Sequence, residues 1–253
     1  MRNALLLILV LSMVCIGHAQ NFQSDYQIVR LDSSWDSQIN PKLQKYVHAQ
    51  RKKLNKKLDV VIGRCSETLV SYSPASPLSN FITDLMLSKA PSYVKSSQPI
   101  NCDMAMINFG GIRAQLPAGN ITIEHIYALS PFENHLAFIE IKGRELRKIF
   151  NRHTEQTLNF AFAGAQVTYT DHHPSEIKIQ GLPLIDDKSY TIATIDFISN
   201  GGDEILKDIA FENITFSSIL FRDFIIYEIN NIHKDGKFIT SKDDDRIIIE
   251  NHK

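Results

Sequence analysis

The sequence predicts an α+β domain in which mixed β-sheets carry flanking helices. Stretches with strand and helix patterns interleave irregularly, and strands follow one another directly in the second half. A doubly wound sheet would need regular alternation of strands and helices. No internal repeat, low-complexity stretch or long linker divides the chain after residue 40. We therefore expect one domain over residues 59–253, preceded by a lead-in and an amphipathic helix over residues 20–58.

The start of the chain is typical of a secretory signal peptide. Arg2 precedes an apolar run that ends at Ile16, and the small residue Ala19 stands where cleavage is expected. The run is roughly 13 residues long, shorter than the roughly 20 that a membrane-spanning helix needs. We expect residues 1–19 to be a signal peptide and the protein to be periplasmic or secreted, without a membrane span. Lipid attachment through Cys15 is the less favoured alternative.

Charge and cysteine content limit the possible partners and covalent bonds. The net charge of -1 gives no general attraction to nucleic acid or to an anionic membrane. After removal of a signal peptide, the cysteines are Cys65 and Cys102. An exported protein can join them in a disulfide, but we favour two separately buried thiols, because a pair of cysteines alone does not fix the geometry of a bridge.

The first part of the domain is predicted to contain two helices, a strand and a turn. Apolar residues recur at helical spacing over 41–58 among Lys, Arg and Gln, which predicts an amphipathic helix with a solvated basic face. The apolar run within 59–63 predicts a strand that Gly63 ends. Two prolines within 73–77 predict a turn. Beyond them, the spacing of apolar residues over 78–86 predicts the second helix.

The middle part is predicted to contain two strands and a helix. The short apolar run 104–107 is typical of a buried strand, and the Phe-Gly-Gly that follows breaks it. A further strand is predicted over 136–141. Residues 143–152 predict a helix because their large apolar side chains lie on one side.

The last part is predicted to begin with a β-hairpin. Its strands are 166–170 and 176–179, joined by a polar segment that contains a proline. A strand is expected over 190–195, a helix over 214–229 and a final strand over 246–250.

Most familiar catalytic motifs are absent from the sequence. There is no triphosphate-binding glycine loop, no nucleophile elbow and no zinc-binding His-Glu-x-x-His. Asp171 and His173 have a spacing that could offer two metal ligands, but a two-metal hydrolase needs several more. We interpret this segment as the hairpin turn and expect no metal site here. Other histidines, including His135, stand singly, without a partner at ligand spacing.

Three short segments have compositions that a plain core does not require. The first, residues 108–113, joins an Asn to two adjacent glycines and an arginine at the end of a predicted strand. The second, 129–134, presents a phenylalanine after a proline, followed by an asparagine two residues later. The third, 197–203, runs from a phenylalanine through glycines to an aspartate at another strand end. Ordinary glycine turns and core aromatics are the alternative interpretation of each segment taken alone.

Taken together, these segments suit a nucleoside or nucleotide. Two aromatic rings can sandwich a flat base, with stacking worth about 1–3 kcal/mol per base. A carboxylate accepts hydrogen bonds from ribose hydroxyls, and a guanidinium binds phosphate. Glycines allow the backbone to approach a ligand closely.

The same segments, in this order, resemble the C-terminal domain of the 5'-nucleotidase family. The matching stretches are NFGGIRAQLPAGNIT, ALSPFENHLAFIEIKGREL and TIATIDFISNGGDEI, and the resemblance extends from about Val60 to Glu250. It implies that Phe132 and Phe197 sandwich the base, that Asp203 holds the ribose and that Arg113 approaches phosphate or ribose. The full set of substrate-binding residues that it implies is Asn108, Gly110, Gly111, Arg113, Phe132, Asn134, Phe197, Gly202 and Asp203, with the two asparagines toward the base.

The sequence also departs from this family. Members usually carry further phosphate-facing arginines just before the helix that starts here near Leu78, whereas residues 71–76 contain none. This departure favours nucleosides or sugars over tightly bound phosphate. The family's two metals and catalytic histidine belong to an N-terminal metallophosphatase domain, for which this sequence shows no counterpart.

The expected function is therefore nucleotide or nucleoside recognition in a 5'-nucleotidase-like system of nucleotide catabolism. We expect no catalytic residue and no cofactor in this chain, with divalent metals only in a separate metallophosphatase subunit, so its status as an enzyme stays open. The alternatives are an exported nucleoside-binding protein without catalysis and a structural relative that binds no ligand.

Overall fold

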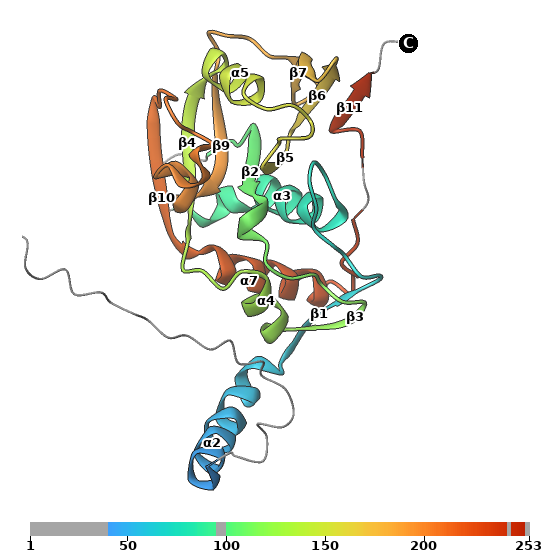
Figure 1. Ribbon diagram of the computed structural model, residues 1–253, viewed down its shortest axis with the longest axis vertical. Coiled ribbons are helices and arrows are strands. Elements are labelled where there is room, and N and C mark those ends of the chain that lie inside the picture. Colours follow the sequence, from blue (N-terminus) through green and yellow to red (C-terminus); the bar gives the residue numbers. More distant parts are fainter. Residues whose placement is uncertain (1–39, 95–99, 242–243, 251–253) are drawn as a thin grey trace, which may run out of the picture. The chain divides into compact units, whose positions relative to one another are not determined.

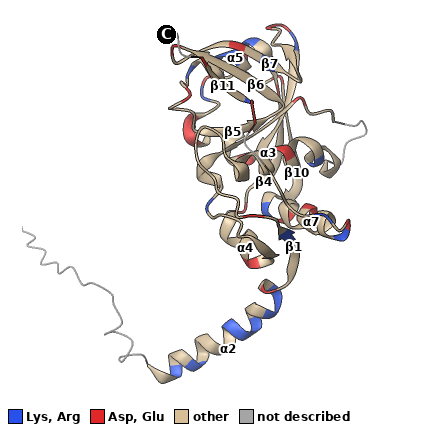
Figure 2. Ribbon diagram, turned by 90° about the vertical axis from the view of Figure 1, so that its right-hand side faces the viewer, with Lys and Arg blue, Asp and Glu red and all other residues tan. Residues whose placement is uncertain are grey.

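The computed structural model describes residues 40–94, 100–241 and 244–250 (Figure 1). The predicted signal peptide and lead-in over residues 1–39 lie outside the described residues. The chain divides into two compact units, residues 1–50 and 51–253. Helix α2 (Pro41–Leu58) begins in the first and continues into the second, with the bounds that the sequence predicts. Its charged residues are all basic, as Figure 2 shows.

The second unit has the predicted α+β architecture, with three mixed or antiparallel sheets and flanking helices (Figure 1). The main sheet has the order β10-β4-β9-β2-β5, the second β11-β6-β7-β8 and the third β1-β3. The strands are β1 (Val61–Cys65), β2 (Met104–Asn108), β3 (Gly119–Thr122), β4 (His135–Lys142), β5 (Phe160–Ala163), β6 (Ala165–Thr170), β7 (His173–Ile179), β8 (Leu182–Pro183), β9 (Ser189–Ile195), β10 (Asn213–Leu220) and β11 (Ile247–Glu250). The helical elements are α3 (Pro77–Lys89), η2 (Ala90–Tyr93), η3 (Phe109–Gly111), α4 (Ile123–Leu129), α5 (Gly143–Asn151), α6 (Asp196–Ser199), η4 (Gly202–Glu204) and α7 (Phe221–Lys234).

The core forms where apolar faces of helices meet the main sheet. Every residue of β2 is buried, which explains the unbroken apolar run in its sequence. Helix α3 packs against β2 and β5 through the apolar side predicted from its spacing, including Leu78, Ile82 and Met86. Pro77 starts α3, and the side chains of Ser76 and Ser79 form its capping box. Within the described residues, no helix combines the length and hydropathy needed to cross a membrane.

One predicted helix was wrong over its first half. Residues 214–220 belong to strand β10, and the helix α7 begins only at Phe221. The strand exists because β10 pairs antiparallel with β4, for example Ile214 with Ile139 and Phe216 with Ala137. Such long-range pairing overrides the local apolar spacing that suggested one continuous helix. Strand β1 also starts two residues later than predicted, and β3, α4 and β5 were not predicted.

The β6–β7 hairpin is confirmed, with a shorter turn than the sequence suggested. Asp171 and His172 occupy the turn with φ angles of 49° and 67°, the left-handed conformation that tight hairpin turns require. Nδ1 of His172 lies 2.6 Å from Oε1 of the buried Glu155. Both Cys65 and Cys102 are free thiols, and burial raises the pKa of Cys102 to about 12.

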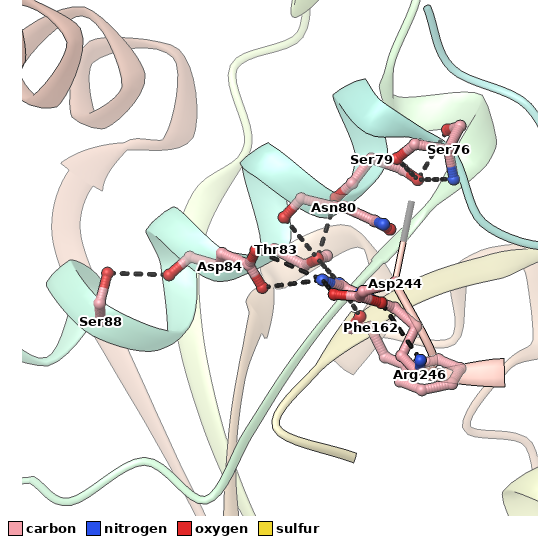
Figure 3. A network of polar contacts seen from close by, with 9 residues as sticks. All are labelled: Ser76, Ser79, Asn80, Thr83, Asp84, Ser88, Phe162, Asp244 and Arg246. Carbon is pink, nitrogen blue, oxygen red and sulfur yellow. Dashed lines mark hydrogen bonds and ion pairs between the residues drawn. The ribbon is translucent and has the colours of Figure 1, made fainter. Parts of the chain in front are cut away.

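A buried arginine fastens the last described strand to the core (Figure 3). Arg246 is 8% exposed, and its guanidinium donates to both carboxylate oxygens of Asp244 at 2.6 Å. It also donates to the carbonyl oxygen of Phe162 at 2.6 Å, and to Thr83 Oγ1 and Asp84 Oδ1 at 3.1 Å. The hydrogen bond from Arg246 holds the pKa of Asp244 below its ordinary value. These bonds tie the segment before β11 to α3 and β5.

Candidate functional site

The three segments singled out in the sequence meet at one edge of the main sheet. Strands β2 and β9 are parallel neighbours, so their carboxyl ends lie at the same edge. Strand β4 is antiparallel to β9, which places its beginning at that edge too. The loops that follow β2 and β9 and the loop that precedes β4 therefore converge, as the course of these strands in Figure 1 shows.

A cleft of about 260 Å³ opens between these loops. Eight of the nine predicted binding residues line it: Asn108, Gly110, Gly111, Arg113, Phe132, Asn134, Phe197 and Asp203. No other residue lines it among those that the structure describes. The ninth, Gly202, does not line the cleft but lies against the ring of Phe197.

Two phenylalanine rings supply most of the apolar surface of the cleft. Phe132, in the loop before β4, is 43% exposed, and Phe197, in α6, is 41% exposed. A Cβ atom at Gly202 would lie within 2.6 Å of three ring carbons of Phe197. The absence of a side chain at position 202 therefore lets the Phe197 ring occupy its place. Neither ring makes a close ring–ring contact within the described residues, so both are available to a flat ligand.

An amide and a carboxylate form the polar floor of the cleft. Asn108, at the end of β2, is 4% exposed, and its Nδ2 donates to Oδ2 of Asp203 at 2.6 Å. Its Oδ1 is buried and has no hydrogen-bond partner among the described residues. Asp203 sits in η4 with a φ of 52°, one of two consecutive left-handed residues after Gly201. The carbonyl oxygen of Asp203 accepts a hydrogen bond of 3.4 Å from Asn159 Nδ2.

Backbone hydrogen bonds hold the other two polar residues in place. The N–H of Arg113 donates to the carbonyl oxygen of Leu129 at 2.8 Å, while its side chain is exposed at the cleft. Within the described chain its guanidinium makes no ion pair, so it is free to meet an anion. The carbonyl oxygen of Asn134 accepts from the N–H of Phe221 at 2.7 Å, which anchors that loop to the start of α7.

One contact near the site was missed by sequence reasoning. His135 Nδ1 lies 3.4 Å from Asp196 Oδ2. His135 follows Asn134 directly and Asp196 precedes Phe197, so this pair joins the bases of the two loops that carry the rings. The expectation for His135 concerned metal-ligand spacing alone, and a partner 61 positions away along the chain leaves no local spacing signal.

The serines just before and at the start of α3 use their hydroxyl groups in hydrogen bonds within the protein. Ser76 and Ser79 cap the helix through their hydroxyl groups, and Ser73 Oγ donates to the carbonyl oxygen of Leu158 at 2.7 Å. No arginine stands in this segment. Within residues 40–94, 100–241 and 244–250, no cluster of three or more His, Cys, Asp or Glu is arranged to hold a metal ion.

Comparisons with known proteins agree with the fold and the loops. The family described as "5'-nucleotidase, C-terminal domain" matches residues 61–208, more than half of the chain. Protein UshA of Yersinia enterocolitica is 33% identical over 105 residues, which are 40% of this chain and 19% of UshA. The trifunctional nucleotide phosphoesterase protein YfkN of Bacillus subtilis is 30% identical over 141 residues, 50% of this chain and 9% of YfkN. The chain thus spans a fifth or less of the length of these curated relatives.

Solved structures show the same fold. The crystal structure of a 5'-nucleotidase precursor from Thermus thermophilus superposes with a TM-score of 0.69 at 21% identity, covering 83% of this chain and 43% of that one. The NAD nucleotidase of Haemophilus influenzae gives a TM-score of 0.61 at 14% identity, covering 92% of this chain and 48% of that one.

Proposed function

The chain belongs to the family of 5'-nucleotidase C-terminal domains, and from that membership we propose that it recognises nucleosides or nucleotides in a 5'-nucleotidase-like system. The observation that carries the proposal is the single cleft in which two rings, an amide, a carboxylate and a guanidinium come together. These groups match the parts of a nucleotide: a flat base, a polar base edge, a ribose and a phosphate.

Each group has a definite task in the proposed complex. Phe132 and Phe197 stack on the two faces of the base, which is worth about 1–3 kcal/mol per stacked base. Asn134 offers an amide to the edge of the base, because an amide both donates and accepts hydrogen bonds. Asp203 accepts hydrogen bonds from the ribose, and Arg113 meets a phosphate with its planar set of donors.

The cleft favours a nucleoside or a nucleoside monophosphate over larger ligands. Its volume of about 260 Å³ is small, since ligand pockets usually measure roughly 300–1,000 Å³. Among the described residues that line it, Arg113 is the one cation. The serines near residue 76 are used in helix capping and offer no further positive charge. Phosphate therefore adds less to affinity here than the base and the ribose do.

We place the hydrolytic step on a separate metallophosphatase subunit. Two metal ions would activate water and neutralise phosphate charge there, while this chain holds the nucleoside part of the substrate. The relative YfkN is named as a nucleotide phosphoesterase, and this chain matches only 9% of it. The apolar run after Arg2 supports export to the periplasm or the medium. A nucleoside-binding protein that works without any catalytic subunit is the alternative.

A reconstitution experiment distinguishes a recognition domain that works with a metallophosphatase subunit from a nucleoside-binding protein that works alone. The purified chain is used to capture proteins from an extract of its native source, and phosphate release from AMP is measured with and without the captured fraction, in the presence of divalent metal. The proposal predicts capture of a metallophosphatase and hydrolysis that exceeds that of either component alone. The Phe132→Ala variant is the matched control: it should capture the same subunit but raise the KM for AMP. Nucleoside binding without capture of a metallophosphatase would support the stand-alone alternative.

A further inference from the structure

We infer that Asn108 is a positioning residue that acts through Asp203. The inference rests on the proposed function, in which Asp203 meets the ribose. It adds a task to the role that the sequence resemblance implies for this asparagine. Three observations support it: the burial of the amide, the conformation of Asp203 and the two glycines that surround the amide.

The Asn108 amide is almost fully buried at the cleft and is bonded to the Asp203 carboxylate. The residue is 4% exposed, and its Oδ1 is fully shielded from solvent. Its Nδ2 makes a hydrogen bond of 2.6 Å to Asp203 Oδ2, which is short for an N–H donor and typical of one with a charged acceptor. One N–H of the amide is therefore engaged with the carboxylate and fixes the position of that oxygen.

Asp203 needs such a support because, among the described residues, no other side chain bonds to its carboxylate. The residue lies in an exposed turn and adopts a left-handed φ of 52°, followed by Glu204 with a φ of 53°. Within the described part of the chain, no lysine, arginine or histidine forms an ion pair with it. A side chain on such a turn would sample several rotamers, and binding of each ligand would carry the entropy cost of selecting one. The bond from Asn108 occupies Oδ2 and leaves Oδ1 available to a ligand in the cleft that Asp203 lines.

The two glycines after Asn108 make room for this arrangement. A Cβ atom at Gly111 would lie 2.8 Å from Asn108 Oδ1, closer than real Cβ atoms approach. A Cβ atom at Gly110 would lie 3.3 Å from Asn108 Nδ2 and 3.7 Å from Asp203 Oδ2. The glycine pair therefore surrounds the amide–carboxylate bond. The lack of side chains at both positions leaves room for this bond as well as for the approach of a ligand.

The inference is tested with a ligand pair that differs only in the ribose. The affinities of adenosine and 2',3'-dideoxyadenosine are measured by calorimetry for the wild type, Asn108→Ala, Asp203→Ala and the double variant. We expect Asn108→Ala to weaken adenosine about tenfold, which is the size of a charge-assisted hydrogen bond. The affinity for dideoxyadenosine should stay within about twofold, because that ligand has no hydroxyl for Asp203. The double variant should bind adenosine no more weakly than Asp203→Ala.

Asn108→Asp is the shape-matched variant. It keeps the size of the side chain but brings a second carboxylate to Asp203, so it should reproduce the loss for adenosine alone. An equal loss for both ligands in Asn108→Ala would overturn the inference in favour of a base contact or general loosening of the site. Melting temperatures of all variants identify any loss of folding.

A ligand-free readout keeps the inference separate from the proposed function. In a crystal structure of Asn108→Ala, the Asp203 carboxylate should leave its wild-type position. A carboxylate that stays in place would overturn the inference, whatever the protein binds. A wild type that binds neither adenosine nor dideoxyadenosine would refute the proposed function, and the ribose-specific role of Asn108 with it.

Discussion

Gly202→Ala tests whether the position of the Phe197 ring matters for binding. The new methyl group would lie within 2.6 Å of three carbons of that ring, whereas non-bonded carbons prefer roughly 3.5–4.0 Å. The ring, the turn or both must therefore shift by about 1 Å. Phe197 lines the cleft and Gly202 does not, so we expect the shift to displace the ring relative to a bound base.

The expected loss follows from the stacking energy. A base that loses one of its two rings forfeits about 1–3 kcal/mol, which corresponds to a loss of affinity of roughly 5- to 150-fold. The methyl group displaces the ring without removing it, so we expect the lower half of this range, about tenfold. Displacement of a packed ring also destabilises the protein, by about 1–3 kcal/mol for an overpacked site.

Calorimetric titration with adenosine measures the effect, with Gly236→Ala as the matched control. Gly236 follows α7, has a φ of 72° and has open space around its missing side chain. Alanine there should cost stability through backbone strain but leave adenosine affinity unchanged. If folded Gly202→Ala bound adenosine within about twofold of the wild type, the position of the Phe197 ring would not matter for binding, contrary to this prediction.

Three further predictions follow from particular contacts. Arg246→Met should lower the free energy of unfolding by about 2–4 kcal/mol, measured with urea, because buried acceptors lose their donor while the cleft is untouched. The hydrogen bond from His172 holds the pKa of Glu155 below its ordinary value of 4.5. This pair therefore stabilises the fold above that pH, and the stabilisation is lost as the pH falls. In His172→Ala, the melting temperature should fall less steeply with acidification than in the wild type. Arg113→Ala should weaken AMP but not adenosine, so that a calorimetric preference for AMP disappears.

The elements with strong local patterns were predictable from the sequence. The apolar spacing of α3 and α5 is helical, and the short apolar run of β2 is that of a buried strand, so each needs no distant partner to be recognised. Strand β10 could not be predicted in this way. Its residues 213–220 form a strand because β4, far earlier in the chain, supplies the hydrogen bonds. The same holds for β5, whose four residues are all buried and show no alternation.

The composition of the candidate site was predictable, but its internal contacts were not. Rings, glycines and polar groups at strand ends mark binding loops, and the sheet topology brings those loops together. The bond between Asn108 and Asp203 joins residues 95 positions apart, so no local pattern announces it. The pair His135–Asp196 and the packing of Gly202 against the Phe197 ring are likewise products of the tertiary structure.

The most direct test of the central claim is calorimetric titration of the purified protein with adenosine, AMP and UDP-glucose, beside the Phe132→Ala variant. A recognition site predicts saturable binding of at least one ligand, weakened about tenfold or more when the Phe132 ring is removed. No heat with any ligand from a protein that unfolds cooperatively on heating would contradict the claim, and would leave a domain that keeps the fold of its family without the recognition site.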